Sequence, residues 1–148
     1  MKDKSLIALF SLRIALGWLF LYSGYSKLIA AGGFSAKGFL LNLQGPFSTF
    51  YLPLAGNSIV DQLVIWGEIL IGISLILGFL VRFAGFWGIV MMILFYFAGF
   101  PPEHAFLVNE HIIYILIFIF FITSNAGHFW GMDKKLEKFL PQLKSLMG

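Results

Sequence analysis

Residues 63–80, LVIWGEILIGISLILGFL, form an apolar run of helical length with one charged residue, Glu68. An α-helix rises about 1.5 Å per residue, so about 17–25 mostly apolar residues can cross a hydrocarbon core about 30 Å thick. A carboxylate inside such a run is costly unless it is paired, protonated or next to a cavity. This stretch therefore predicts a membrane-spanning helix in which Glu68 has a polar partner.

The rest of the chain has the same character. Its 148 residues are 59% hydrophobic and 11% charged, whereas soluble domains carry about 25% charged residues. Apolar segments long enough to span a membrane lie at about 5–28, 59–80, 83–100 and 107–124. We expect one all-α domain over residues 1–148, an integral membrane four-helix bundle with up-down topology. The first span is too long for a signal-peptide core, so we expect it to be retained.

The distribution of positive charge predicts the orientation of this bundle in the cell membrane. If the spans alternate in direction, the N-terminus, the turn at Arg82 and the C-terminal tail share one side, which carries most of the lysines and arginines. The positive-inside rule then places both termini in the cytoplasm. The net charge of +3 reflects this bias, and we expect no nucleic-acid partner.

Two segments lie outside the predicted spans. Residues 29–58 are rich in glycine, proline and aromatic residues, which predicts an outer interfacial loop, either a lid over a site or a plain spacer. The tail, residues 131–148, has lysines between apolar residues that share one side, namely Leu136, Phe139, Leu140 and Leu143. This pattern is typical of an amphipathic segment on an anionic membrane surface or against a partner.

The residue types present limit the chemistry. The chain has no cysteine, which excludes disulfides, iron–sulfur clusters and thiol redox cycling, so any redox chemistry belongs to a bound ligand or a partner. His111 and His128 are separated by about 25 Å along one helix and cannot ligate one haem, so we expect no haem. His104, His111 and a glutamate match no metal motif, and we expect no metal site.

Arg13 is the predicted partner of Glu68. It lies about eight residues, or about 12 Å, into the first span, and Glu68 lies about 14 Å from the opposite end of the second. These depths nearly coincide, which predicts an Arg13–Glu68 pair near mid-membrane. Such a pair can fix the register of two helices. Alternatively, the guanidinium holds an anion or carbonyl ligand while Glu68 carries a proton. Both interpretations stay open at this point.

A second group of polar residues gathers at the predicted outer mouth of the bundle. Lys27 ends the first span, Glu110 and His111 begin the fourth, and Tyr114 shares a helical face with Glu110. These four residues could line a proton-exchanging site for a quinone head group, although helix capping is the plainer interpretation. The candidate catalytic residues are therefore Glu68 and Glu110, and the candidate ligand-binding residues are Arg13, Lys27, His111 and Tyr114.

Glycines recur along the predicted helices and favour close helix packing. Gly17 and Gly24 share a face of the first span, and further small residues follow in the second and third spans, namely Gly67, Gly72, Ser74, Gly78, Gly85 and Gly88. Small residues let helix backbones approach each other in a membrane. We expect these positions to be helix contacts.

Three stretches together carry a family pattern: LRIALGWLFLYSGYSKL (12–28), GEILIGISLILGFLVRFAGFWG (67–88) and NEHIIYILIFIFFITSNAGHFWGMDKKL (109–136). The combination resembles the DoxX/DoxD family of small four-helix membrane proteins. The positions that match its motifs are Arg13, Gly24, Lys27, Gly67, Glu68, Gly78, Arg82, Gly127 and Asp133. The end, NAGHFWGMD, departs most from the family pattern.

The resemblance implies a membrane subunit of an oxidoreductase system. The DoxD branch is the larger subunit of a thiosulfate:quinone oxidoreductase, and DoxX proteins are associated with sulfur metabolism and oxidative-stress complexes. We therefore expect a quinone-interacting subunit that works with a second oxidoreductase subunit. The alternative is a non-catalytic membrane anchor or scaffold whose tail recruits soluble redox enzymes. A carrier is disfavoured because the chain has no inverted repeat. Membrane lipid is an expected partner, and a homo-oligomer stays open.

Overall fold

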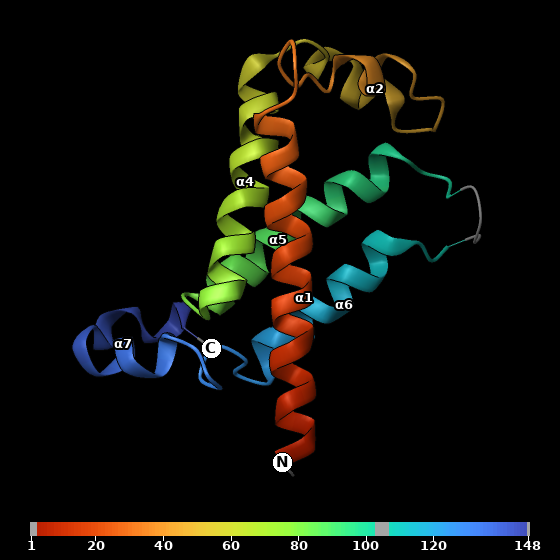
Figure 1. The fold of residues 1–148 in the computed structure, drawn as a ribbon. Coiled ribbons are helices and arrows are strands. Elements are labelled where there is room, and N and C mark those ends of the chain that lie inside the picture. The colour runs from red at the N-terminus through yellow and green to blue at the C-terminus, as the bar shows by residue number, and fades with distance from the viewer. Residues whose placement is uncertain (1–2, 103–106, 148) are drawn as a thin grey trace.

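The computed structural model describes residues 3–102 and 107–147, and all regular structure in these ranges is helical. The long helices are α1 (Asp3–Leu28), α4 (Ser58–Leu77), α5 (Val81–Ala98) and α6 (Glu110–Thr123). α1 packs along α4 in the opposite direction, and α5 pairs with α6 in a second, tilted unit (Figure 1). The predicted all-α class is confirmed, and the helices are compatible with a membrane bundle.

Three helices in the described part of the chain are long and apolar enough to cross a membrane: Lys4–Leu28, Ser58–Leu77 and Val81–Ala98. They match the first three predicted spans. The fourth prediction, 107–124, was too long, since α6 has 14 residues and measures about 21 Å. The physical reason is its N-cap. The Asn109 side chain accepts hydrogen bonds from the backbone N–H groups of His111 and Ile112, so the helix begins at Glu110.

Glycines bring the helices of each pair together, as predicted. A Cβ on Gly72 of α4 would lie 2.8 Å from the carbonyl oxygen of Gly17 in α1, so these backbones are in direct contact. On α5, a Cβ at Gly88 would overlap the ring of Phe118 from α6. The main core fills the space between the two pairs, with the buried residues Leu9, Leu16, Phe20, Ile71, Leu75, Val81, Met92, Phe118, Phe121 and Ala126.

The segment 29–58 folds over one end of the bundle. It contains α2 (Lys37–Leu41), α3 (Ser48–Tyr51) and the 3-10 helix η1 (Leu52–Leu54). Tyr51 donates a hydrogen bond to the Leu94 carbonyl at 2.8 Å, and Asp61 accepts one from the backbone N–H of Ala36 at 2.7 Å. These contacts attach the loop to α5 and α4, so it covers the top of the bundle in Figure 1.

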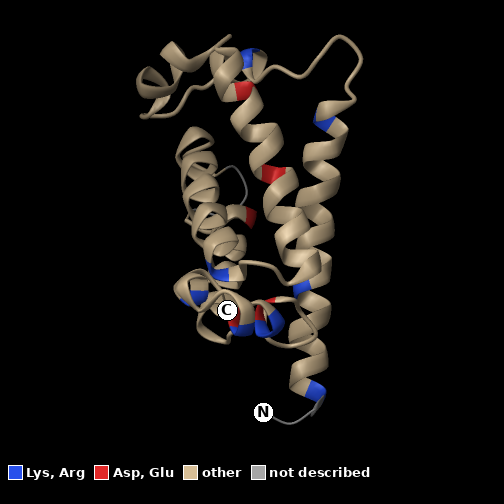
Figure 2. Cartoon of the chain, turned by 90° about the vertical axis from the view of Figure 1, so that its left-hand side faces the viewer, with Lys and Arg blue, Asp and Glu red and all other residues tan. Residues whose placement is uncertain are grey.

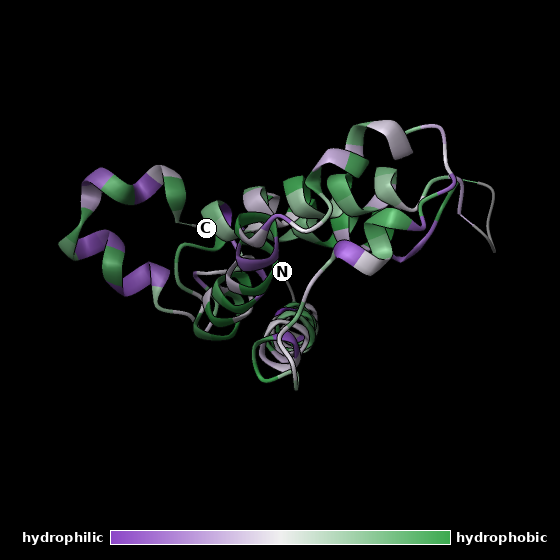
Figure 3. Ribbon diagram, turned by 90° about the horizontal axis from the view of Figure 1, so that it is seen from above, coloured by the Kyte–Doolittle hydropathy of each residue, from purple (hydrophilic) through white to green (hydrophobic). Residues whose placement is uncertain are grey.

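The tail occupies the opposite end as two short helices, α7 (Asp133–Phe139) and the 3-10 helix η2 (Pro141–Leu146). Pro141 cannot continue α7, which ends at Phe139. Hydrophilic and hydrophobic residues alternate along this segment (Figure 3). Phe139 is its most exposed large apolar side chain, at 81%. The tail is therefore amphipathic but broken, not one continuous helix.

The ends of the molecule differ in charge. α1 begins at the end that carries the tail (Figure 1), and most lysines and arginines lie at this same end (Figure 2). The prediction that both termini are cytoplasmic rested on this clustering of positive charge. The side of the membrane on which the two termini lie stays a prediction.

Candidate functional site

A cavity of about 650 Å³ lies beneath the loop 29–58, where α1, α4, α5 and the start of α6 come together. This volume is in the range of about 300–1,000 Å³ found for small-molecule sites. Its apolar lining includes Phe34, Phe39, Val64, Phe95 and Val108, and its polar lining includes Lys27, Glu68, Asn109, Glu110 and His111. An aromatic wall with a few convergent polar groups is the usual composition of a ligand site.

The inner polar group of the cavity is an ion pair between Lys27 and Glu68. Lys27 Nζ donates to Glu68 Oε2 at 2.6 Å and Oε1 at 2.9 Å, and also to Ser23 Oγ at 2.7 Å. The Glu68 side chain is 6% exposed and that of Lys27 is 23% exposed. Lys27 Nζ also lies 5.7 Å from the ring centroid of Phe34 in the loop. The carboxylate buried in the apolar run is thus paired with Lys27, about four helical turns beyond Arg13 on α1.

The predicted Arg13–Glu68 pair is wrong. Gly17 packs against Gly72 and Leu75, and the guanidinium of Arg13, one turn earlier, lies level with Gly78. Gly78 is ten residues beyond Glu68, or about 15 Å along α4. The depth estimate assumed that the two helices end at the same level. α1 has 26 residues and α4 has 20, and α1 extends past α4 at the tail end (Figure 1).

Arg13 instead binds the segment that follows α6. Its guanidinium donates to the backbone carbonyls of Ala126, Phe129 at 3.1 Å and Trp130 at 3.3 Å. Arg13 is fully buried, and it is close enough to Asp133 to be attracted by its charge. It does not line the cavity beneath the loop. Its predicted role in ligand binding therefore gains no support from the geometry.

Asp133 has a structural role that the sequence analysis did not predict. Its fully buried carboxylate accepts hydrogen bonds from the backbone N–H groups of Leu80 at 2.6 Å and Val81 at 3.1 Å, at the start of α5. It fastens the chain after α6 to the turn between α4 and α5, while Arg13 fastens the same segment to α1. The available signal was the glycine-to-aspartate exit in the family pattern, where one acid precedes a run of lysines.

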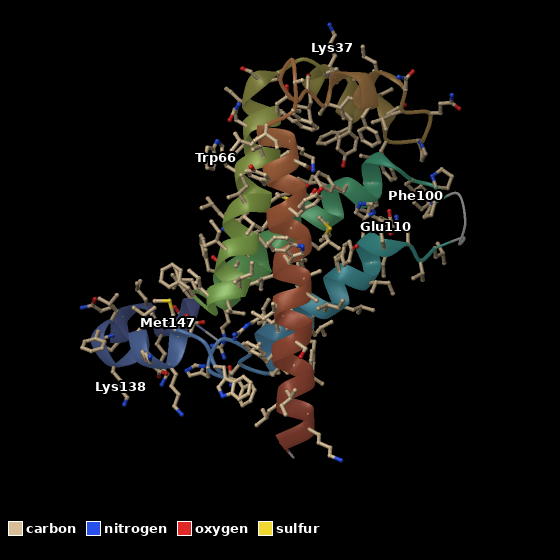
Figure 4. The ribbon with its side chains drawn as sticks, in the orientation of Figure 1. Lys37, Trp66, Phe100, Glu110, Lys138 and Met147 are labelled. Atoms are coloured by element: carbon tan, nitrogen blue, oxygen red, sulfur yellow. The ribbon has the colours of Figure 1, made fainter. Side chains whose placement is uncertain are left out.

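The outer polar group of the cavity is formed by the first turn of α6. Asn109 Oδ1 accepts two backbone hydrogen bonds, so its amide nitrogen donates to His111 Nδ1 at 3.0 Å. This leaves Nε2 as the protonated nitrogen of a neutral His111. Glu110 Oε1 lies 3.7 Å from His111 Nδ1, and the Glu110 side chain is 65% exposed. Figure 4 labels Glu110 at the start of α6. Both predicted residues thus belong to the cavity and reach its outer side.

Tyr114 does not join this group, although it is one turn after Glu110. It packs on the main core, with its ring centroid 6.1 Å from that of Phe20 in an edge-to-face contact. Its predicted role in ligand binding therefore also gains no support. Of the six candidate residues, the structure brings Lys27, Glu68, Glu110 and His111 to one cavity and leaves Arg13 and Tyr114 outside.

Within residues 3–102 and 107–147, no group of three His, Asp or Glu side chains is placed to hold a metal ion. His104, which the sequence analysis considered as a metal ligand together with His111, lies outside the described residues.

A family comparison supports the resemblance drawn from the motifs. The family model DoxX matches residues 8–100, more than half of the chain, including Arg13, Lys27 and Glu68. The match ends before α6, so it does not cover Asp133, and it does not distinguish the DoxD branch. Comparisons with curated proteins and with solved structures find no significant match. The chain belongs to the DoxX family and, with its long apolar helices, is a multi-pass membrane protein.

Proposed function

We propose that this chain is the membrane subunit of a quinone-linked oxidoreductase system and that the cavity beneath the loop 29–58 binds the quinone ring. One observation carries the proposal: an aromatic wall, a buried ion pair and two titratable side chains share a single cavity of about 650 Å³. Membership of the DoxX family, which is often linked to quinone oxidoreductase systems, supports it. A reduced sulfur compound such as thiosulfate is the proposed source of electrons.

The lining fits a flat ring with carbonyl oxygens. Phe34, Phe39 and Phe95 offer apolar faces, and the Phe95 ring meets His111 edge to face with centroids 6.0 Å apart. The Nε2–H of His111 is a donor for a ligand carbonyl, because Nδ1 is engaged by Asn109. Lys27 gives its three N–H groups to Glu68 and Ser23, so it acts on a ligand through its charge.

A quinone takes up two electrons and two protons when it is reduced to a quinol. In the proposal, His111 and Glu110 supply protons at the outer side, because the Glu110 side chain is exposed and can exchange with water. Glu68 is the proposed inner proton group, held in place by Lys27. The chain has no cysteine for thiol redox chemistry, so the electrons come from a partner subunit.

Quinone binding tests the proposal directly. The purified chain in nanodiscs is titrated with a short-tail quinone, and Phe39→Ala is compared with Phe50→Ala. Both phenylalanines are exposed residues of the loop, but only Phe39 lines the cavity. We expect Phe39→Ala and His111→Ala to raise the Kd about tenfold and Phe50→Ala to leave it unchanged. No saturable binding, or an equal loss in Phe50→Ala, would contradict the proposal.

The proton roles need a second measurement in the native complex. Glu68→Gln and Glu110→Gln keep the shape of each side chain and remove its titratable proton. We expect these variants to retain quinone binding while quinone reduction by the complex slows about 100-fold or more. Full activity of both variants with an intact fold would remove the glutamates from the proton path.

The anchor alternative is favoured by one observation. Lys134, Lys135 and Lys138 of α7 are all exposed and available to an acidic partner. The test replaces these three lysines with glutamine rather than deleting the tail, because deletion would also remove Asp133 from the start of α5. Loss of a co-purified soluble redox enzyme, with quinone binding absent in the wild type, would favour the anchor.

A further inference from the structure

A second cavity, of about 240 Å³, lies at the tail end of the molecule, away from the proposed quinone site. It is lined by Arg82 at the start of α5, Asn125 and His128 after α6, and Glu137, Lys144 and Met147 in the tail. This volume is below the range of about 300–1,000 Å³ typical of sites for drug-sized ligands. The cavity therefore suits one small polar group and not a ring cofactor.

The cationic side chains of this cavity are held in position by hydrogen bonds. Glu137 Oε1 lies 2.6 Å from Lys144 Nζ, and its Oε2 lies 2.8 Å from His128 Nε2. Arg82 Nη2 donates to Asn125 Oδ1 at 2.6 Å. One carboxylate faces two permanent cations, so the lining keeps a net positive charge even when His128 is neutral. A site with two permanent cations from separate segments, Arg82 of α5 and Lys144 of η2, is suited to an anion.

Two of these side chains also have unused hydrogen-bonding capacity. Arg82 Nε and His128 Nδ1 are buried and have no hydrogen-bond partner among the described residues. Arg82 Nε is always a donor, whereas His128 Nδ1 can donate to an anion only in the protonated ring, because Nε2 faces Glu137. Buried polar atoms without a partner are rare in native proteins, and each one calls for an explanation. The guanidinium of Arg82 can bind an oxyanion through two parallel N–H groups, and Lys144 retains donors beyond its bond to Glu137.

We propose that this cavity binds a phosphate group, carried by an anionic phospholipid or present as free phosphate. Phe86 lies one turn after Arg82 on the same side of α5 and is 56% exposed. A phosphate held by Arg82 therefore has an apolar helix surface directly beside it, along which an acyl chain can lie. Basic pockets at the ends of membrane helices bind lipid head groups in this way.

The test uses the full chain purified in detergent, with native mass spectrometry and thermal shift as readouts. The probes are inorganic phosphate, a short-chain phosphatidylglycerol and the phosphatidylcholine of equal chain length. Arg82→Gln and Lys144→Gln remove cations of the cavity. Lys138→Gln is the matched control, because Lys138 is an exposed lysine of the tail (Figure 4) and is not among the residues that line the cavity.

We expect phosphatidylglycerol to bind about tenfold more weakly to Arg82→Gln and Lys144→Gln, and equally to Lys138→Gln and the wild type. Competition by inorganic phosphate at equal affinity would identify free phosphate as the ligand, and its failure to compete would identify the lipid. Equal losses in Lys138→Gln and Lys144→Gln, or no binding of any probe, would overturn the proposal. If Arg82→Gln does not fold, Arg82→Lys keeps the charge without the fork and should give an intermediate loss.

Discussion

Buried charges in this bundle have two different environments. Lys27 and Glu68 pair at the wall of a cavity, where a ligand can reach them. Arg13 is enclosed by backbone carbonyls, and a Cβ on Gly78 or Gly131 would lie 2.8 or 3.0 Å from its Nη1. A guanidinium in such a space holds segments together and has no room for a ligand. Burial of a charge is common to both residues, and only their surroundings separate them: Glu68 lines a cavity, for which we propose a function, whereas Arg13 joins segments of the chain.

The Lys27–Glu68 pair allows a double-mutant test of its role. Lys27→Met should destabilise the chain by about 3–5 kcal/mol, since it leaves a buried carboxylate without its cation. Glu68→Leu should cost less, because Lys27 is partly exposed and can turn toward water. The double variant should recover most of the wild-type free energy of unfolding, which thermal and denaturant unfolding in detergent can measure. Additive losses in the double variant would show that the pair is not coupled.

Helix packing in this fold depends on contacts between backbones. At Gly24 of α1, a Cβ would lie 2.8 Å from the Ile65 carbonyl of α4, and Gly72 makes the reciprocal approach to α1. Association of membrane helices relies on such close packing because lipid offers no hydrophobic gain for it. The close approach of α1 and α4 also holds Lys27 within hydrogen-bonding distance of Glu68.

A substitution in the contact between α1 and α4 should therefore lower the stability of the chain. Gly72→Ala should destabilise the chain by about 1–3 kcal/mol, because the added methyl group would force α1 away from α4. Gly38→Ala is the control: nothing lies within 4 Å of a Cβ there, and alanine favours the helix α2. Unfolding midpoints in detergent measure both effects. Equal stability of the two variants would contradict this account of the contact.

The tail is held together in part by ion pairs between its own side chains and His128. Hydrogen bonds from Lys144 and His128 lower the pKa of Glu137 from 4.5 to about 2. A lowered carboxyl pKa stabilises the fold above the unfolded value, so this contribution is complete above pH 4.5 and is lost as the pH falls through about 2. NMR titration of the Glu137 carboxyl should show this midpoint. Lys144→Gln should move it toward 4.5, and an unchanged midpoint would exclude Lys144 as its main cause.

The whole molecule has two ends with different chemistry. The proposed quinone site lies beneath the loop 29–58, and the proposed phosphate site lies beside the tail. Most of the lysines and arginines gather at the tail end (Figure 2), as proteins of this class place them toward the cytoplasm. The orientation predicted from this bias would put the proposed quinone cavity near the outer face and the proposed phosphate cavity near the inner leaflet.

The chain has no cysteine, so single cysteines can test this orientation without background labelling. Lys37→Cys in the loop and Lys138→Cys in the tail are both at exposed positions. In intact cells, a membrane-impermeant maleimide should label Lys37→Cys at once and Lys138→Cys only after the membrane is opened. The reverse pattern would place both termini outside the cytoplasm.

Composition and local periodicity by themselves determined that this chain is all-helical and that its first three apolar segments can span a membrane, because these properties depend on neighbouring residues. The small residues also indicated where helices could approach closely, although the partner of each glycine is a tertiary property. Composition and periodicity also brought Lys27, Glu110 and His111 to one end of the bundle. Only the tertiary structure decided the partners of Glu68 and Arg13, since these depend on how far α1 extends past α4. It also decided that the Asp133 carboxylate accepts the backbone N–H groups at the start of α5. Helical spacing carries no information on this contact, because the two segments are far apart in the sequence.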